Sequence, residues 1–138
     1  MRSPRPRPVP DLHTAPYWQG LLRNVLLVQE CESCSVRIHP SRPCCPHCLN
    51  TDLRWVEIVG TGIVTGFCVV AQPFVPGIAT PYVIVRVSLS GAPEVELVAN
   101  IVGKPTTALA VGAQVHIVYD EVDDDLVLAN FELVANVA

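Results

Sequence analysis

Apolar and polar residues alternate along most of the chain that follows Trp55, which is the pattern of half-buried β-strands. Valine is frequent at the apolar positions, and β-branched side chains fit a pleated surface. Glycine, proline, serine and aspartate interrupt the alternation and mark turns. We predict strands at 55–59, 62–72, 82–90, 94–102, 113–120 and 126–134, with a short helical turn within 104–112. Such strands with one helical insertion suit a small closed barrel of the OB type over residues 55–138.

Residues 11–28 follow a helical period instead. Apolar side chains recur there at steps of three and four residues, at Tyr17, Trp18, Leu21, Leu22 and Val25. Asp11 and Thr14 can each cap the start of a helix, and the pattern turns extended near Leu26. We expect a helical segment whose apolar stripe packs on the rest of the chain or on a partner. Ahead of it, residues 1–10 alternate proline with arginine, which predicts an extended, mobile arm.

Half of the 138 residues are apolar, so the chain has enough material for a core. The net charge of −4 is unevenly placed, with +3 on residues 1–54 and −7 on residues 55–138. A surface that binds nucleic-acid phosphates needs a basic groove, and the barrel half lacks the charge for one. The sequence shows no secretory signal and no apolar run near the ~20 residues that span a bilayer, so we expect a cytoplasmic protein.

Four of the six cysteines form two pairs with the same spacing, Cys31-x2-Cys34 and Cys45-x2-Cys48. Two residues between thiolates allow one tight turn to aim both sulfur atoms at one point, and two such turns complete a tetrahedron. Where thiols stay reduced, such a cluster is more often a metal site than a disulfide framework. Four protein ligands leave no coordination position for water or substrate. The spacing therefore predicts a structural zinc ion and not a catalytic one.

Three features of the cysteine segment leave alternatives open. Cys44 adjoins Cys45 and His47 lies inside the second pair, so the choice of Cys45 rests on the repeated spacing. Turns of this kind usually carry glycine after the second cysteine, because that position favours a left-handed backbone, whereas this chain has Ser35 and Leu49 there. The same four thiolates also suit iron in a rubredoxin-like site.

The sequence offers little catalytic machinery. It contains no Gly-x-Ser-x-Gly motif, no phosphate-binding loop and no dinucleotide fingerprint. Cys68 lies in a valine-rich strand, where we expect a small apolar residue of the barrel wall or core. The four histidines fall in unrelated segments. We therefore assign no catalytic residue and do not expect an enzyme that acts alone.

These motifs together resemble the zinc-ribbon/OB-fold proteins of the domain-of-unknown-function-35 (DUF35) family. The resemblance rests on Tyr17-Trp18-x-Gly20-Leu21, Leu26-Leu27-Val28-Gln29-x-Cys31-x-x-Cys34 and Pro40-x-Arg42-Pro43-x-Cys45-Pro46-x-Cys48. It continues more diffusely in Trp55-Val56-Glu57-x-x-Gly60-x-Gly62 and Pro81-Tyr82-Val83. It implies a mainly β protein with a helical segment over 11–28, a rubredoxin-like zinc ribbon over 29–54 and an OB-fold barrel over 55–138.

The resemblance also implies a partner. Members of this family are commonly small subunits of thiolase-superfamily enzymes, including acyl-CoA thiolases, steroid side-chain aldolases and acyltransferases. The thiolase-like subunit brings the nucleophile, and the small subunit helps to form the acyl-CoA site. The helix face and the apolar loop 73–81 are candidate contacts with the partner or acyl-CoA, through Tyr17, Trp18, Leu21, Phe74 and Tyr82. The alternative for the helix is that it covers the barrel, and for the chain that it is a nucleic-acid-binding module.

Overall fold

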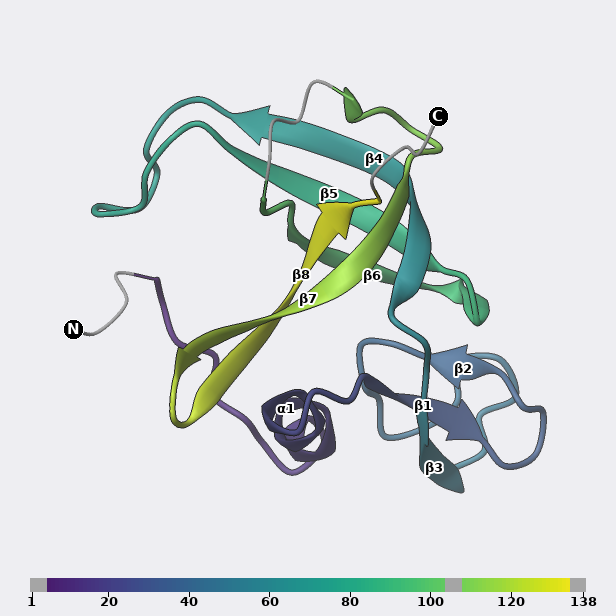
Figure 1. The fold of residues 1–138 in the computed structure, drawn as a ribbon. Coiled ribbons are helices and arrows are strands. Elements are labelled where there is room, and N and C mark those ends of the chain that lie inside the picture. Colours follow the sequence, from purple (N-terminus) through teal and green to yellow (C-terminus); the bar gives the residue numbers. More distant parts are fainter. Residues whose placement is uncertain (1–4, 104–107, 135–138) are drawn as a thin grey trace.

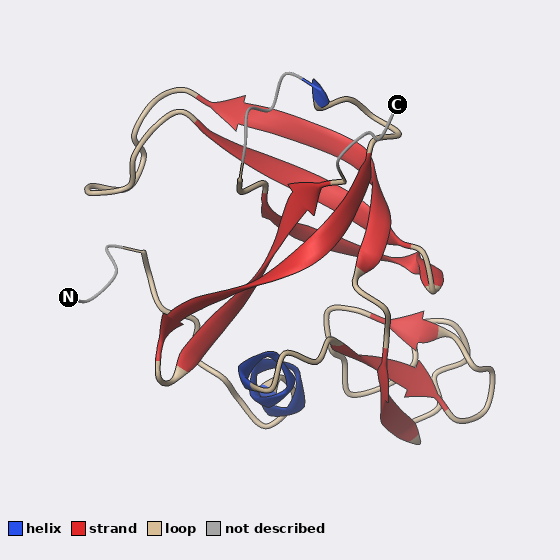
Figure 2. Cartoon of the chain, in the orientation of Figure 1, coloured by secondary structure: helices blue, strands red, loops and turns tan. Residues whose placement is uncertain are grey.

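The computed structural model describes residues 5–103 and 108–134, in which a short helix accompanies two antiparallel β-sheets (Figures 1 and 2). The helix and the smaller sheet lie next to each other at one end of the larger sheet (Figure 1). The helical turn predicted within 104–112 falls partly outside the described residues. Within the two described ranges, no helix has the length and apolar character needed to cross a membrane.

The larger sheet has five strands in the order β6-β5-β4-β7-β8. They are β4 (Thr61–Val70), β5 (Tyr82–Leu89), β6 (Ala92–Asn100), β7 (Gln114–Asp123) and β8 (Leu126–Leu133). The chain just after β6 meets β8, where Ile101 pairs in parallel with Phe131 and the N–H of Val102 donates to the carbonyl oxygen of Phe131 at 2.8 Å. The sheet therefore closes almost completely into an OB-fold barrel, which confirms the fold class predicted from the alternation.

Inward-facing aliphatic side chains fill the barrel. On β5, Val83, Val85, Val87 and Leu89 are buried, and the residues between them are partly or fully exposed. Phe131 of β8 is fully buried as well and is the largest side chain in that state among the described residues. Full burial of each such side chain contributes about 1.5–3 kcal/mol relative to exposure to water.

The smaller sheet has the order β2-β1-β3, and we call this sheet and its two cysteine turns the ribbon. Its strands are β1 (Leu27–Cys31), β2 (Arg37–Ile38) and β3 (Leu53–Glu57). The strand predicted at 55–59 as part of the barrel belongs here instead, because Trp55 pairs with Gln29 of β1. The chain changes sheets at Gly60, where a Cβ atom would lie 2.0 Å from Cγ2 of Ile117. This close approach of β7 requires glycine.

The helix α1 spans Ala15–Leu22 and is shorter than the segment predicted over 11–28. The carboxylate of Asp11 accepts hydrogen bonds from two backbone N–H groups at 2.9 Å, which builds a separate turn ahead of the helix. At the other end, Asn24 adopts a left-handed backbone (φ 57°), which stops the helix. The chain is extended from Leu27, close to Leu26, where the sequence pattern turns extended.

The N-terminal arm contacts the barrel over the residues that are described. Arg7 forms an ion pair with Asp123, the last residue of β7. Nη1 of Arg5 donates a hydrogen bond to Oδ1 of Asn100, at the end of β6, at 2.8 Å. Within the arm predicted to be mobile over 1–10, residues 5–8 therefore lie along the barrel surface, and residues 1–4 fall outside the described residues.

Candidate functional site

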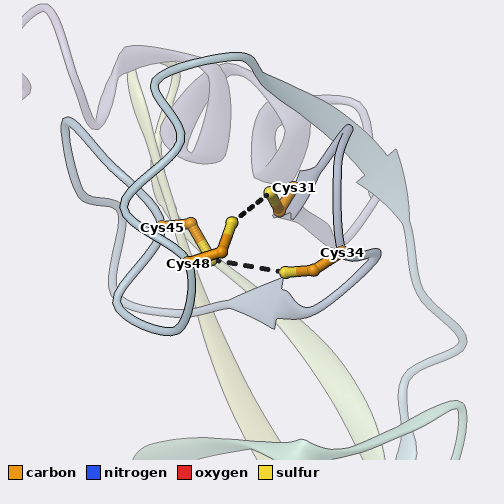
Figure 3. A group of neighbouring side chains, drawn as sticks. All are labelled: Cys31, Cys34, Cys45 and Cys48. Atoms are coloured by element: carbon orange, nitrogen blue, oxygen red, sulfur yellow. Dashed lines mark hydrogen bonds between the residues drawn. The ribbon is translucent and has the colours of Figure 1, made fainter.

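Two turns of the ribbon bring four cysteines together (Figure 3). Cys31 ends β1 and Cys34 follows in the turn toward β2, whereas Cys45 and Cys48 lie between β2 and β3. The Sγ atoms of Cys31 and Cys48 are 3.5 Å apart, those of Cys34 and Cys45 are 3.6 Å apart, and all four lie within 4.8 Å of one another. Tetrahedral coordination with ~2.3 Å metal–sulfur bonds separates sulfur atoms by ~3.8 Å. The four side chains therefore fit one metal ion.

The two turns share one backbone geometry despite their missing glycines. Ser35 and Leu49, the residues after the second cysteine of each pair, have left-handed φ angles of 62° and 64°. The N–H of Ser35 donates to the carbonyl oxygen of Cys31, and that of Leu49 donates to Cys45, both at 2.9 Å. A left-handed backbone costs an L-residue roughly 1–2 kcal/mol, so the turns hold these residues in a conformation that glycine would adopt freely.

Backbone N–H groups point at the sulfur atoms and favour the thiolate forms that bind metal. The N–H groups of Cys48 and His47 lower the pKa of Cys45 to about 6. The pKa of Cys31 is also lowered, mainly by the N–H of Cys34. For Cys34, the N–H of Val36 lowers the pKa, but burial and the neighbouring sulfur atoms outweigh it and raise the pKa to about 12. The pKa of Cys48 is raised as well, since the sulfur of Cys31 and burial outweigh the N–H of Asn50. Binding of a divalent cation would displace the protons that these thiols hold.

The cluster contains Cys45 and not its neighbour Cys44. The side chain of Cys45 is completely buried, as is that of Cys31, whereas Cys48 is exposed at the edge of the site. Four cysteines supply all the ligands of a tetrahedral metal ion. A bound ion would therefore stabilise the ribbon and have no free coordination position for a substrate.

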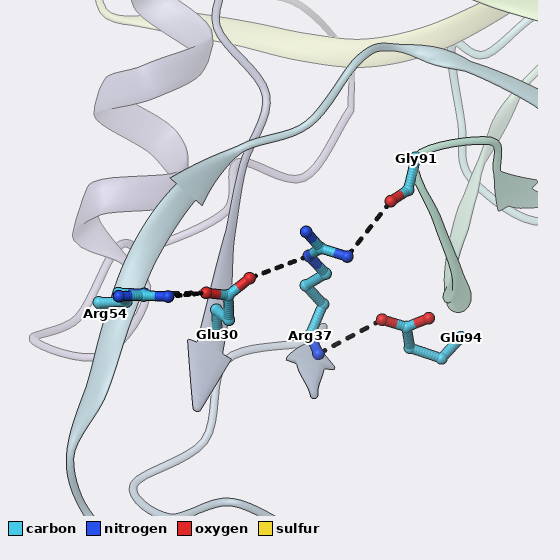
Figure 4. A network of polar contacts seen from close by, with 5 residues as sticks. All are labelled: Glu30, Arg37, Arg54, Gly91 and Glu94. Carbon is cyan, nitrogen blue, oxygen red and sulfur yellow. Dashed lines mark hydrogen bonds and ion pairs between the residues drawn. The ribbon is translucent and has the colours of Figure 1, made fainter. Parts of the chain in front are cut away.

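Glu30 is a buried carboxylate beside the cluster that the sequence reasoning did not single out (Figure 4). Nε of Arg54 donates to its Oε1 at 2.9 Å, and Nε of Arg37 lies 3.1 Å from its Oε2. Arg37 also reaches the barrel, because its Nη1 donates to the carbonyl oxygen of Gly91 and its backbone N–H donates to Glu94, both at 3.4 Å. Glu30 is opposite Arg37 on β2 and opposite Arg54 on β3. The sequence alone does not reveal this cluster of charges, because it depends on how the strands are paired.

The hydrogen bond from Arg54 and the charges of Arg54 and Arg37 hold the pKa of Glu30 below its ordinary value. The three strands of the ribbon are thereby joined through one ionised carboxylate. The same network fastens the ribbon to the turn between β5 and β6.

The three helix residues that were candidate partner contacts differ in how deeply they are buried. Leu21 is fully buried in the barrel core, so the expectation that its side chain meets a partner is wrong, and the alternative that it covers the barrel holds. Tyr17 and Trp18 are partly buried, with their rings edge to face and their centroids 5.0 Å apart. Burial raises the pKa of Tyr17 to about 12. With His39 and Trp55 they line a cavity of ≈ 270 Å³ between helix, ribbon and barrel.

The end of the β4–β5 hairpin exposes apolar side chains. Phe67 is 43% exposed, Val69 is 57% exposed and Phe74, in the connecting loop, is 76% exposed. Tyr82, the first residue of β5, is partly buried. Cys68 lies between Phe67 and Val69 and is exposed, which corrects its assignment to the wall or core. β4 extends past the part of the sheet that β7 pairs with, so apolar residues at this end have few neighbours to cover them.

Two family models of known proteins match the chain, one over the ribbon and one over the barrel. Residues 18–54 match the family model of the ChsH2 rubredoxin-like zinc ribbon domain, and residues 55–120 match that of the ChsH2 C-terminal OB-fold domain. The match names zinc and not iron, so together with the four converging cysteines it confirms a structural zinc site.

Two curated relatives are hydratase subunits. The chain is 35% identical over 127 residues to a probable enoyl-CoA hydratase alpha subunit of Thermomonospora curvata, and 30% identical over 118 residues to the 3-oxo-4,17-pregnadiene-20-carboxyl-CoA hydratase alpha subunit of Mycobacterium tuberculosis. These alignments cover 92% and 86% of this chain but only 39% and 37% of the relatives. The chain thus spans about two fifths of their length.

Two solved structures are similar over most of the chain. A chain of the Ltp2-ChsH2(DUF35) aldolase superposes with a TM-score of 0.83 at 33% identity, and the match covers 92% of this chain and 98% of that one. A protein of unknown function from the DUF35 family of Sulfolobus solfataricus superposes with a TM-score of 0.65 at 19% identity, covering 89% and 86%. The second likeness bears on the fold alone.

Proposed function

Because the chain belongs to the DUF35 family of zinc-ribbon/OB-fold proteins, we propose that it is the accessory component of a heteromeric acyl-CoA enzyme. In this proposal a thiolase-like subunit carries the nucleophile and this chain helps to form the acyl-CoA site. The aldolase is the model for the arrangement, since its matched chain is covered almost end to end. A cytoplasmic location is part of the proposal, because the thiolate ligands need a reducing compartment.

The reaction of the complex is proposed at the level of acyl-CoA chemistry. The aldolase and the two hydratase alpha subunits differ in the reaction they are named for, and two of the three names concern acyl-CoA substrates. A carbon–carbon bond-cleaving enzyme of steroid or other lipid side chains is the reading that the aldolase favours. The hydratases support it less, because most of their length lies outside the match.

The zinc site supports a scaffold role in this proposal. Its four ligands close the coordination sphere, and the Glu30 network ties the ribbon to the β5–β6 turn. Such a centre holds surfaces in place and does not activate water. The chemistry would then take place in the partner subunit.

The end of the β4–β5 hairpin is the surface that we propose for the partner or acyl-CoA. Phe67, Val69 and Phe74 expose large apolar side chains within one hairpin, and Tyr82 starts its second strand. Aromatic residues are enriched at the energetic centres of interfaces. Tyr17 and Trp18 remain candidates at the helix, because both are partly exposed and line the ≈ 270 Å³ cavity.

Co-expression with a thiolase-like protein encoded beside this chain tests the proposal. We expect the two proteins to co-elute from a sizing column, and neither to turn over acyl-CoA alone at the rate of the complex. Phe74→Ser should weaken the complex at least about tenfold, as expected for an interface hot spot. Val59→Ser is the matched control, because Val59 is 67% exposed but precedes the opposite end of β4.

A chain that stays monomeric beside every such candidate would contradict the proposal. So would tight, salt-sensitive binding to single-stranded oligonucleotides, which the charge of −7 on residues 55–138 disfavours.

A further inference from the structure

Two loops flank a cleft at one end of the barrel, and the chain's own arm lies in it. Loop 71–81 joins β4 to β5, and the turn after Asp123 joins β7 to β8. In OB folds the corresponding loops border the ligand-binding face. Here the purple N-terminal segment passes the tip of the β7–β8 hairpin (Figure 1). Its residues Arg5, Pro6, Arg7 and Pro8 enclose a cavity of ≈ 280 Å³ together with Ile78, Val122, Leu126 and Leu128.

The cleft and the arm that covers it are complementary in polarity. The barrel side of the cavity consists of four aliphatic side chains from loop 71–81, β7 and β8. Pro6 and Pro8 present apolar rings to it, and proline fixes φ near −65°, so the segment is extended before it binds. The arginines that alternate with them also line the cavity and make polar contacts with the barrel, Arg5 with Asn100 and Arg7 with Asp123.

Charge adds a preference for a cationic segment. The β7–β8 turn carries three consecutive aspartates, Asp123 to Asp125. Arg7 lowers the pKa of Asp123, and Asp125 adds to the field that raises the pKa of Arg7. An anionic or neutral extended segment would lack this attraction.

The polar contacts of Arg7 are exposed, which bears on how firmly the arm is held. Its side chain is 46% exposed and that of Asp123 is 42% exposed. Exposed ion pairs contribute little because water and salt screen them. None of the residues of the arm belongs to the core clusters found among the described residues. Displacing the arm would therefore leave the fold intact.

We propose that this cleft is a binding groove for extended proline–arginine segments, and that residues 5–8 occupy it as a displaceable strap. The ligand class is a cationic polyproline-type peptide with arginine at every second position. A segment of that chemistry on another chain binds only by competing with the strap. This inference does not depend on the accessory role proposed above.

A labelled peptide of residues 5–10 (Arg-Pro-Arg-Pro-Val-Pro) tests the groove by fluorescence anisotropy. It is titrated into the full chain and into a full-length Arg5→Ser/Arg7→Ser variant, whose strap lacks both side-chain anchors. We expect the variant to bind the peptide severalfold more tightly, because its strap, a tethered competitor at an effective concentration near the millimolar range, loses two polar contacts. Arg23→Ser/Arg42→Ser, which removes two exposed arginines elsewhere, should bind as the wild type does.

Two further binding measurements test the specificity of the groove. Adding Asp123→Asn to the variant should weaken peptide binding, and Ser-Pro-Ser-Pro-Val-Pro should bind no better than a scrambled peptide without proline. Zinc content and circular dichroism check that every variant is folded. Equal affinity of the peptide for the wild type and for Arg5→Ser/Arg7→Ser, or no binding to the variant, overturns the proposal.

Discussion

Nη1 of Arg37, on the ribbon strand β2, lies 3.4 Å from the carbonyl oxygen of Gly91, in the turn between β5 and β6. The same side chain lies 3.1 Å from the buried carboxylate of Glu30. One arginine therefore joins the interior of the ribbon to a turn of the barrel (Figure 4). The orientation of the zinc site relative to the barrel depends on this contact together with the shared core.

Glu30→Gln should destabilise the protein by about 1–2 kcal/mol in urea unfolding. The change leaves two arginines without their carboxylate, and although a fully buried pair costs more to break, these guanidinium-bearing side chains are 35% and 55% exposed and remain partly hydrated. Glu121→Gln is the control, since Glu121 is exposed on strand β7 of the barrel. Equal unfolding free energies for the two variants would argue against the network.

The contribution of Glu30 to the free energy of unfolding should disappear in acid. Its pKa is lowered in the folded state, so the stabilisation is fully present above the unfolded value of about 4.3 and is lost as the pH falls through the lower folded value. We expect the difference in unfolding free energy between wild type and Glu30→Gln to be constant from pH 7 to 5.5 and to shrink below it. Comparing the two proteins at each pH removes the effect of acid on the zinc site, which they share.

Cys45→Ser should lose the bound zinc, and Cys44→Ser should keep about one equivalent. Only the first removes a sulfur atom of the cluster, and metal binding contributes folding free energy directly. Metal analysis after dialysis against a mild chelator measures both. Retention by Cys45→Ser with loss from Cys44→Ser would reverse the ligand assignment.

Leu49→Gly should retain zinc at least as well as the wild type, and Leu49→Val should retain it less. Leucine at φ 64° is strained, glycine is not, and a β-branched residue fits this conformation worst. A difference of about 1 kcal/mol between glycine and leucine corresponds to roughly fivefold in metal affinity. Competition with a chromophoric chelator gives the order, and wild-type affinity in Leu49→Val would contradict it.

Gly60→Ala should destabilise the barrel by about 1–3 kcal/mol, because the added Cβ would clash with Ile117 at 2.0 Å. Gly91→Ala is the matched control, since its Cβ would meet only Ile58 at an ordinary 3.7 Å. Ile117→Ala should partly relieve the clash in a double variant. Thermal unfolding compares the four proteins, and an equal loss in both alanine variants would exclude the steric cause.

The parts of the fold that local patterns determine could be predicted from the sequence. Alternation gave the strands of the barrel, and the repeated cysteine spacing pointed to the residues whose sulfur atoms converge. Both signals depend on residues a few positions apart. The left-handed backbone at Ser35 and Leu49 also follows from the spacing, although neither residue favours it.

Features decided by distant residues could not be predicted in the same way. The pattern of Trp55 shows a strand, but only its pairing with β1 shows that the strand belongs to the ribbon. The apolar stripe of the helix predicts that the helix packs on a surface, but not whether that surface belongs to a partner or to the barrel, which in fact buries Leu21. The apolar neighbours of Cys68 in the sequence suggest a core position. Its exposure follows from the part of β4 that extends beyond the pairing with β7, which the sequence does not show.

Strand β1 carries Val28, which is buried in the barrel core, and three residues later Cys31, which is part of the metal cluster. The border between the two packed clusters therefore lies inside a five-residue strand and not in a linker. Amide hydrogen exchange in zinc-free protein should be fast at Cys31 and remain slow at Val28. A change at the metal can then reach the barrel along the backbone of β1, and along β3 as well, since Leu53 packs beside the cysteines and Val56 packs against the barrel core.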